Sequence, residues 1–165
     1  MKLEELYKEV YPKIFTFFYV RIGDRQTAED LTQDVFFQAF KNYHTFSGNS
    51  TIETWIFGIA KNHLRNFYRK KKYRKQLLEK IRKHDVPEDS PEEQVMEKEE
   101  KRTLLDVIQQ LEELPKEVVM LRIYGELSFN EISSLVNKSE GHTRIIFHRA
   151  TLKIQKELDD RDEKV

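Results

Sequence analysis

The stretch of sequence that decides the fold lies at residues 114–150 and reads LPKEVVMLRIYGELSFNEISSLVNKSEGHTRIIFHRA. Ser128 suits a helix start, because its hydroxyl can accept a hydrogen bond from a free backbone amide, and Glu131 completes a capping box. Asn137 and Gly141 bound a turn, since Asn and Gly tolerate a positive φ. Two helices joined in this way form a helix-turn-helix, whose second helix enters the DNA major groove. An ordinary helical hairpin with a solvated charged face is the alternative.

The second helix of this pattern is predicted to run from about Glu140 to Leu158. Its apolar residues can pack against the first helix while its basic residues face outward. The apolar positions are Ile145, Ile146, Phe147, Leu152 and Ile154, and the basic ones are Arg144, His148, Arg149, Lys153 and Lys156.

Residues 46–72 form a second informative stretch, a polar loop followed by an aromatic and then strongly basic helix. Such a mixture suits single-stranded DNA, because flat side chains stack on unpaired bases, at roughly 1–3 kcal/mol per base, while cations track phosphates. The alternative is that the apolar residues simply form core and the lysines are solvated. We expect Ile56, Ile59 and Ala60 to point inward and the basic end to point outward.

Charge is balanced over the whole chain, with 29 Lys and Arg against 29 Asp and Glu, but it is unevenly distributed. Almost all charged residues between positions 61 and 83 are Lys or Arg, whereas most charged residues between positions 85 and 113 are Asp or Glu. Local fields steer charged partners, so a net charge of zero does not exclude DNA binding. The absence of cysteine fits a reducing compartment. Without a signal peptide or an apolar run of about 20 residues, a soluble cytoplasmic protein is expected.

The remaining sequence also predicts helices. Apolar residues recur at helical spacing from Leu3 to Phe18, although Pro12 is expected to bend or break that helix. Asp24 is expected to cap a second helix, and a third is expected from Trp55 to Lys72. No segment shows the alternation of a half-buried strand, so the fold class is all-α. Prolines among acids in residues 84–97 indicate a disordered or extended linker.

Three segments, in order, resemble the bacterial RNA polymerase sigma factors of the extracytoplasmic-function (ECF) group, in the sigma-70 family. Residues 28–36 are similar to the polymerase-binding helix, residues 54–62 to the promoter-melting segment, and residues 114–150 to the helix-turn-helix. The resemblance implies two small helical domains, sigma-2 at 1–80 and sigma-4 at 99–160, joined by a flexible acidic linker at 81–98. It implies a sigma factor that binds core RNA polymerase and directs promoter recognition, DNA melting and transcription initiation.

Spacing alone places Asp30, Gln33 and Asp34 on one helix face, for which a solvated acidic surface is the ordinary interpretation. The resemblance instead implies that this face binds the clamp coiled coil of the largest polymerase subunit. It also implies that the second-largest subunit contacts the protein through its flap. Phe36 and Phe37 complete the predicted core-binding set. Adjacent aromatic residues cannot both face inward on one helix, so one of the two rings is expected to be partly exposed, and an exposed aromatic beside polar groups has the composition of an interface hot spot.

The resemblance further implies two sets of promoter contacts. At the minus-ten element, the loop at 46–51 would surround a flipped base, Asn62 would read it, and basic residues would contact phosphate. Trp55 would either wedge against the duplex or hold the core. Gly58 departs from the family, which commonly has arginine there. The predicted minus-ten residues are Phe46, Ser47, Gly48, Asn49, Ser50, Trp55, Asn62, Arg65, Arg69, Lys70 and Lys71.

At the minus-thirty-five element, Arg144 is the best candidate to pair with guanine, because a guanidinium can bond O6 and N7 together. Ile146 departs from the family, which has arginine there, and the amides at the helix start with Ser139 would bind phosphate instead. The predicted minus-thirty-five residues are Ser139, His142, Thr143, Arg144, His148 and Arg149.

Other classes of function have less support. The five histidines are scattered, and no metal-binding or nucleophile motif occurs, so no catalytic residue, metal or cofactor is expected and the protein is not predicted to be an enzyme. A helix-turn-helix regulator that acts without polymerase, or a protein-binding helical module, would leave the aromatic–basic stretch or the Asp30 face unexplained. An anti-sigma factor is a further candidate partner, which only the resemblance to the family implies.

Overall fold

The computed structural model describes residues 2–82 and 99–164, and all regular secondary structure in these ranges is helical. The all-α prediction is confirmed. Most of the predicted linker lies outside the described residues. The helices are α1 (Leu3–Ile22), α2 (Arg25–Lys41), the 3-10 helix η1 (Tyr43–Thr45), α3 (Ile52–Ile81), α4 (Glu99–Gln109), α5 (Glu113–Ile123), α6 (Phe129–Val136) and α7 (Glu140–Asp162).

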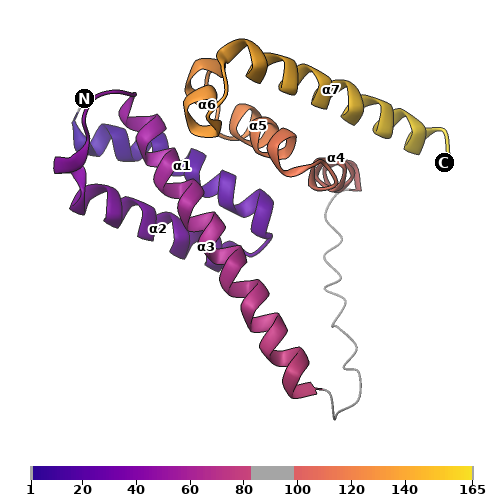
Figure 1. Cartoon of the computed structure of the whole chain (residues 1–165), viewed down its shortest axis with the longest axis horizontal. Coiled ribbons are helices and arrows are strands. Elements are labelled where there is room, and N and C mark those ends of the chain that lie inside the picture. Colours follow the sequence, from indigo (N-terminus) through magenta and orange to yellow (C-terminus); the bar gives the residue numbers. More distant parts are fainter. Residues whose placement is uncertain (1, 83–98, 165) are drawn as a thin grey trace.

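The first helical unit consists of α1, α2 and the first half of α3 (Figure 1). Asp24 caps α2 by accepting from the Thr27 amide, as predicted, and Gly23 ends α1 with a φ of 79°. Pro12 does not break α1, which runs without interruption from Leu3 to Ile22. A stripe of buried side chains, including Ile14 and Phe17, stabilises the helix on both sides of the proline and outweighs one lost amide bond.

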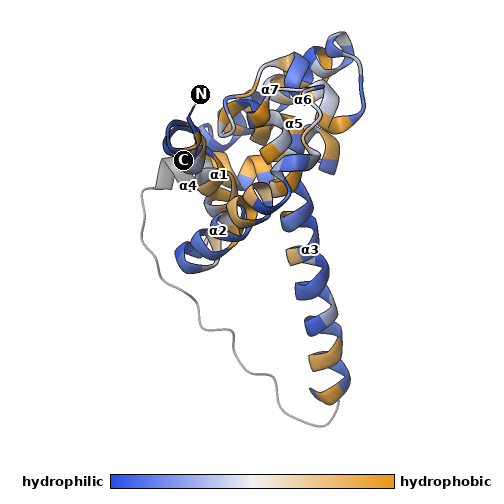
Figure 2. Cartoon of the chain, turned by 90° about the vertical axis from the view of Figure 1, so that its left-hand side faces the viewer, coloured by the Kyte–Doolittle hydropathy of each residue, from blue (hydrophilic) through white to orange (hydrophobic). Residues whose placement is uncertain are grey.

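Helix α3 is longer than predicted at both ends, because it spans Ile52–Ile81 rather than 55–72. It begins where the Thr51 hydroxyl accepts from the Thr54 amide. Its first half carries buried residues, among them Ile56, Ile59 and Ala60, which confirms their inward orientation. Its second half projects beyond the helical body and is predominantly hydrophilic (Figure 2). Lys and Arg have good helix propensity, so the helix continues without a core to pack on.

The second helical unit consists of α4 to α7, with α5 and α6 both packed against α7. The capping box of Ser128 and Glu131 is present, as predicted. Asn137 ends α6 in the left-handed region at φ 55°, and α7 begins at Glu140, also as predicted. Gly141 lies inside the first turn of α7 rather than in the turn between the helices. The pair α6–α7 is therefore a helix-turn-helix.

Candidate polymerase and nucleic-acid interface

The predicted core-binding face lies on α2. Asp30, Gln33 and Asp34 are all exposed, and the Asp30 carboxylate accepts from the Gln26 amide at 3.0 Å, one helical turn away. This bond favours one orientation of the carboxylate on the helix surface.

The two neighbouring phenylalanines of α2 differ sharply. Phe37 is 70% exposed, whereas Phe36 is 2% exposed and packs edge-on against Tyr7, with 5.0 Å between ring centroids. One exposed ring was expected, and it is that of Phe37. Phe36 is therefore removed from the set of contact residues, because its ring belongs to the core between α1 and α2.

The predicted minus-ten loop lies between η1 and α3, beside a row of three aromatic rings. The Phe46 ring lies between Tyr43, at 6.3 Å, and Trp55, at 5.4 Å. Residues 47–49 are exposed, and Gly48 has a φ of 76°, a conformation that favours glycine. Trp55 is half-buried, so it packs against Phe46 and is still partly accessible to solvent. Sequence reasoning did not identify Tyr43, although the sequence does show an aromatic residue three positions before Phe46.

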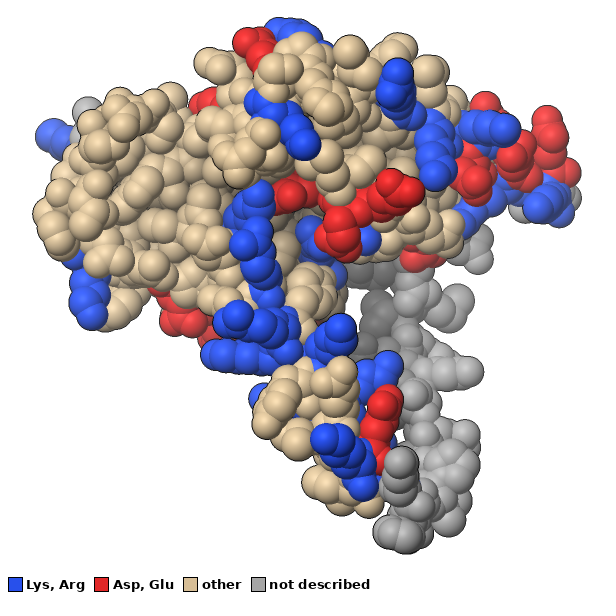
Figure 3. Space-filling view, viewed as in Figure 1, with Lys and Arg blue, Asp and Glu red and all other residues tan. Residues whose placement is uncertain are grey.

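The predicted base reader and phosphate contacts follow along α3. Asn62, Arg65 and Arg69 are exposed at spacings of three and four residues, so they share one face of the helix. Lys70 lies about 80° around the helix from Asn62, outside the shared face, and Lys71 lies about half a turn from Asn62, since each residue turns a helix by roughly 100°. Figure 3 shows the resulting run of positive charge down α3.

In the predicted recognition helix, α7, Arg144 is held in position from two sides. Its guanidinium lies 2.8 Å from the Glu140 carboxylate and 4.8 Å from the centre of the Phe129 ring. His148 lies one turn further along the same exposed face, while His142 and Arg149, also exposed, lie roughly 140–160° around the helix from Arg144. Ile145, beside Arg144, is 50% exposed. The sequence predicted that this apolar residue packs against the first helix, and that prediction is wrong for Ile145.

Two predicted residues at the start of α7 serve the helix itself. Thr143 is fully buried, and its hydroxyl donates to the Ser139 carbonyl at 2.8 Å. The prediction that Thr143 contacts bases is therefore wrong, because the residue packs inward. Ser139 is exposed, and its hydroxyl caps α7 by accepting from the His142 amide.

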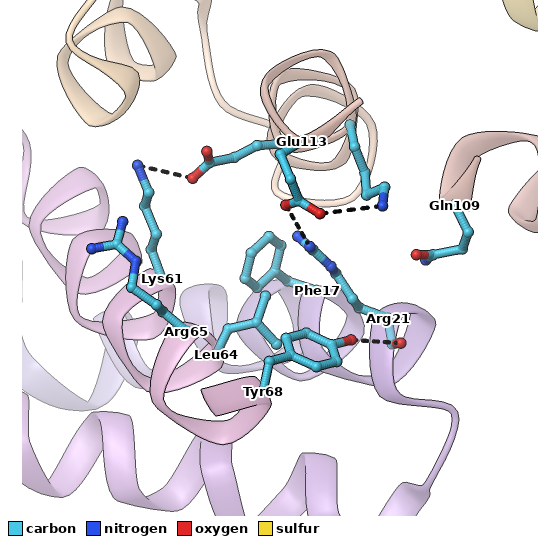
Figure 4. A pocket seen from close by; sticks show the side chains of 10 residues that line it. Phe17, Arg21, Lys61, Leu64, Arg65, Tyr68, Gln109 and Glu113 are labelled. Carbon is cyan, nitrogen blue, oxygen red and sulfur yellow. Dashed lines mark hydrogen bonds and ion pairs between the residues drawn. The ribbon is translucent and has the colours of Figure 1, made fainter. Parts of the chain in front are cut away.

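The two helical units meet across a cleft of about 530 Å³ (Figure 4). Arg21, Lys61 and Arg65 line it from the first unit, and Glu113 and Glu117 line it from the second. Tyr68 closes one side and donates to the Arg21 carbonyl at 3.0 Å; burial raises the pKa of its phenol.

Within residues 2–82 and 99–164, no cluster of three or more His, Cys, Asp and Glu side chains could hold a metal ion. None of the helices in the described part of the chain is long and apolar enough to cross a membrane.

Both helical units match families of known proteins. The sigma-70 region 2 family model matches residues 6–74, and the sigma-70 region 4 model matches residues 107–156. RNA polymerase sigma factor YlaC of Bacillus subtilis (strain 168) is 31% identical over 160 residues, covering 94% of this chain and 91% of that protein. ECF RNA polymerase sigma factor SigX of the same organism is 25% identical over 159 residues, covering 93% and 82%.

The fold is shared with a solved sigma factor, RpoE of Bartonella quintana in complex with the anti-sigma factor NepR. The TM-score is 0.69 at 18% identity, and the alignment covers 94% of this chain and 96% of that one.

Proposed function

The chain belongs to the ECF group of the sigma-70 family, and we propose which of its surfaces bind RNA polymerase and which bind promoter DNA. It binds core RNA polymerase and promoter DNA and directs transcription initiation. The observation that carries this conclusion is the presence of regions 2 and 4, in order, with a relative of 31% identity along nearly the whole chain. A transcription regulator that acts without polymerase is not favoured, because that function would leave the region 2 match at residues 6–74 unexplained.

We propose that residues 1–80 form the polymerase-binding and minus-ten unit, and residues 99–160 the minus-thirty-five unit, with 81–98 as the linker. The face of Asp30, Gln33, Asp34 and Phe37 would bind the clamp coiled coil of the largest subunit. An exposed aromatic among matched polar groups has the composition of a binding hot spot. The second unit would also meet the flap of the second-largest subunit.

At the minus-ten element, the row of Tyr43, Phe46 and Trp55 supports base capture, because aromatic faces stack on unpaired bases. Residues 47–50 would form the wall of the base site. Asn62 would read the captured base, since an amide both donates and accepts. Arg65, Arg69 and Lys70 would contact phosphates of the melted strand. Lys71 would contact phosphates that lie on the opposite side of α3.

At the minus-thirty-five element, Arg144 would pair with a guanine, and its fixed position reduces the entropy lost on binding. His142 and His148 would be secondary base contacts, while Ser139 and Arg149 would lie at phosphates. The exposed Ile145 adds an apolar surface that fits a thymine methyl group at a neighbouring base pair.

We further propose that the chain contributes no catalytic group, since RNA synthesis is the chemistry of the polymerase, and that it acts in the cytoplasm where the polymerase is. An anti-sigma factor is an additional proposed partner, as in the solved RpoE complex.

The decisive experiment is reconstitution of the chain with core polymerase, followed by transcription from a panel of promoters. We expect a stable complex and promoter-dependent transcripts that neither component gives alone. Sequence-specific duplex binding by the chain alone, without any association with core polymerase, would instead support the regulator.

A further inference from the structure

The second half of α3 carries a group of apolar side chains that no described residue covers. Every residue from Arg69 to Arg82 is exposed, although four of them are large and apolar. Ile81 is 73% exposed and Tyr73 is 64% exposed, and Leu77 and Leu78 are exposed as well. Figure 2 shows apolar residues at the free end of this helix, away from the helical body. Exposed apolar side chains that gather in one place indicate a surface that binds a partner.

These four apolar residues share one face of the helix. Each residue turns an α-helix by roughly 100°, which places all four within an arc of roughly 140°. That arc is as wide as the apolar face of a helix that packs on a protein core. Within the described residues, however, this face has no core to pack on. We call the four residues the distal stripe, which consists of Tyr73, Leu77, Leu78 and Ile81.

The distal stripe lies at the edge of the part of the chain that matches the family. The region 2 model ends at residue 74 and the region 4 model begins at residue 107, so three of the four stripe residues lie between the two matches. The proposed promoter contacts on α3 end at Lys71, before the stripe begins. Neither polymerase binding nor promoter binding by regions 2 and 4 therefore accounts for these side chains.

Positive charge surrounds the distal stripe. Residues 69–80 include seven Lys and Arg and a single acidic residue, Glu79. Figure 3 shows uncharged surface among these cations at the free end of α3. A helix with a broad apolar face and many cations is typical of segments that lie in the interface of an anionic membrane without crossing it. Tyr73 suits such an interface, because its ring is apolar while its hydroxyl can stay in water.

A partner helix fits this face less well than a membrane does. Two packed helices share a narrow apolar seam with their charges beside it. Here Lys70 and Arg74 emerge within the apolar arc itself, since they lie about 60° and 100° around the helix from Tyr73. A membrane surface accommodates this mixture, because Lys and Arg stems can lie along apolar groups while their charged ends reach the headgroups. A second copy of the chain is disfavoured, because the cations of the two copies would repel each other.

We propose that the distal stripe, with the cations around it, docks the chain on the surface of a membrane that contains anionic phospholipid. The end of α3 lies along the headgroup boundary, with the stripe toward the acyl chains and the Lys and Arg side chains at the lipid phosphates. The stripe is accessible to a flat surface, because the second half of α3 projects beyond the helical body (Figure 1). This inference does not depend on the proposed promoter contacts, since lipid binding requires neither polymerase nor DNA.

The test is co-sedimentation of the full chain with lipid vesicles. Vesicles of phosphatidylglycerol and phosphatidylcholine in roughly equal amounts should bind the chain, whereas vesicles of phosphatidylcholine alone should not. Added salt should weaken the binding, because it screens the attraction between the cations and the anionic surface. A chain that does not bind the anionic vesicles at low salt would overturn the proposal.

Leu77→Gln combined with Ile81→Gln tests the distal stripe itself, because it removes apolar surface and leaves the charge unchanged. Binding to the anionic vesicles should weaken by roughly tenfold or more, as the loss of two buried apolar side chains implies. Both residues are exposed in the free chain, so its helical circular dichroism signal should not change. The matched control is Leu3→Gln with Leu152→Gln, which removes two similarly exposed leucines from α1 and α7 and should bind as wild type does.

Two further results separate a membrane surface from its alternatives. Arg74→Gln and Lys80→Gln should each weaken vesicle binding by about fivefold, because each removes a cation close to the stripe. If these two variants lose binding but the Leu77/Ile81 variant binds as wild type does, charge alone drives the interaction and the stripe is not a docking face. If the Leu77/Ile81 variant loses affinity for core polymerase while it keeps vesicle binding, the stripe is a protein-binding surface and the proposal fails. Vesicle binding that responds as expected in a chain that forms no holoenzyme would leave this inference standing and refute the proposed function.

Discussion

The hydroxyl of Thr51, which caps α3, donates to the carboxylate of Glu131 at the third position of α6. Two helix starts from different units therefore share one hydrogen bond. Glu131 also accepts from the Ser128 amide at 2.7 Å, so the same carboxylate completes the capping box and ties the helix-turn-helix to α3.

The ionisation of Glu131 should make stability depend on pH. Burial by itself would raise the pKa of this carboxyl, but hydrogen bonds from Ser128, Thr51 and Thr54 outweigh burial and hold the pKa below its usual 4.5. Because the folded-state pKa is lowered, the stabilisation is fully present above about pH 4.5 and is lost as the pH falls through the lowered value. Denaturant unfolding of wild type should show this loss.

The matched variant is Glu131→Gln, which keeps a capping side chain but does not titrate. Its free energy of unfolding should fall less steeply than that of wild type between about pH 5 and pH 3. Equal slopes would show that other carboxyls account for the acid sensitivity.

Two glycines should respond oppositely to alanine. A Cβ at Gly125 would lie 2.6 Å from the Leu121 carbonyl oxygen, closer than real contacts allow, so Gly125→Ala should destabilise the protein by roughly 1–3 kcal/mol. Gly141 lies in α7 with open space around its Cβ position, so Gly141→Ala should stabilise by roughly 0.5–1 kcal/mol. Equilibrium urea unfolding measures both; a neutral Gly125→Ala would mean that the turn relaxes without cost.

Changing Asp30 and Gln33 together to alanine should abolish binding to core polymerase while leaving the helical circular dichroism signal unchanged. Both side chains are exposed, so neither supports the core. The control changes Gln155 and Asp159 on α7 to alanine and should leave binding to core polymerase unchanged. These two side chains form a similar hydrogen bond, because Gln155 donates to Asp159 at 2.9 Å just as Gln26 donates to Asp30. Wild-type affinity of the Asp30/Gln33 variant for core polymerase would remove this face from the interface.

Arg144→Ala should lower discrimination at one base pair of the minus-thirty-five element by roughly 1–3 kcal/mol. Lys70→Ala should instead weaken binding evenly across promoters and flatten its salt dependence, because a phosphate contact releases a counterion. Holoenzyme binding to a promoter panel at several salt concentrations separates the two. An equal loss on all sequences for Arg144→Ala would make Arg144 a phosphate contact.

The sequence alone determined those features that depend on a few neighbouring residues. Asp24 and Ser128 start helices, and Asn137 ends one, because each cap bonds a backbone group within four positions of itself. Helical periodicity and the absence of alternating segments were enough to establish the all-α class. The order of the three characteristic segments was enough to identify the family.

Only the tertiary structure decided which of two similar neighbours faces inward and where the two units meet. Phe36 and Phe37 are chemically identical, and the position of α1 determines which of them is buried. Thr143 could equally have faced DNA until the packing of α7 placed it inside. Thr51 and Glu131 are 80 residues apart, and no local pattern encodes their contact. That contact depends on the shape of two folded surfaces, which the chain forms only after its helices have packed.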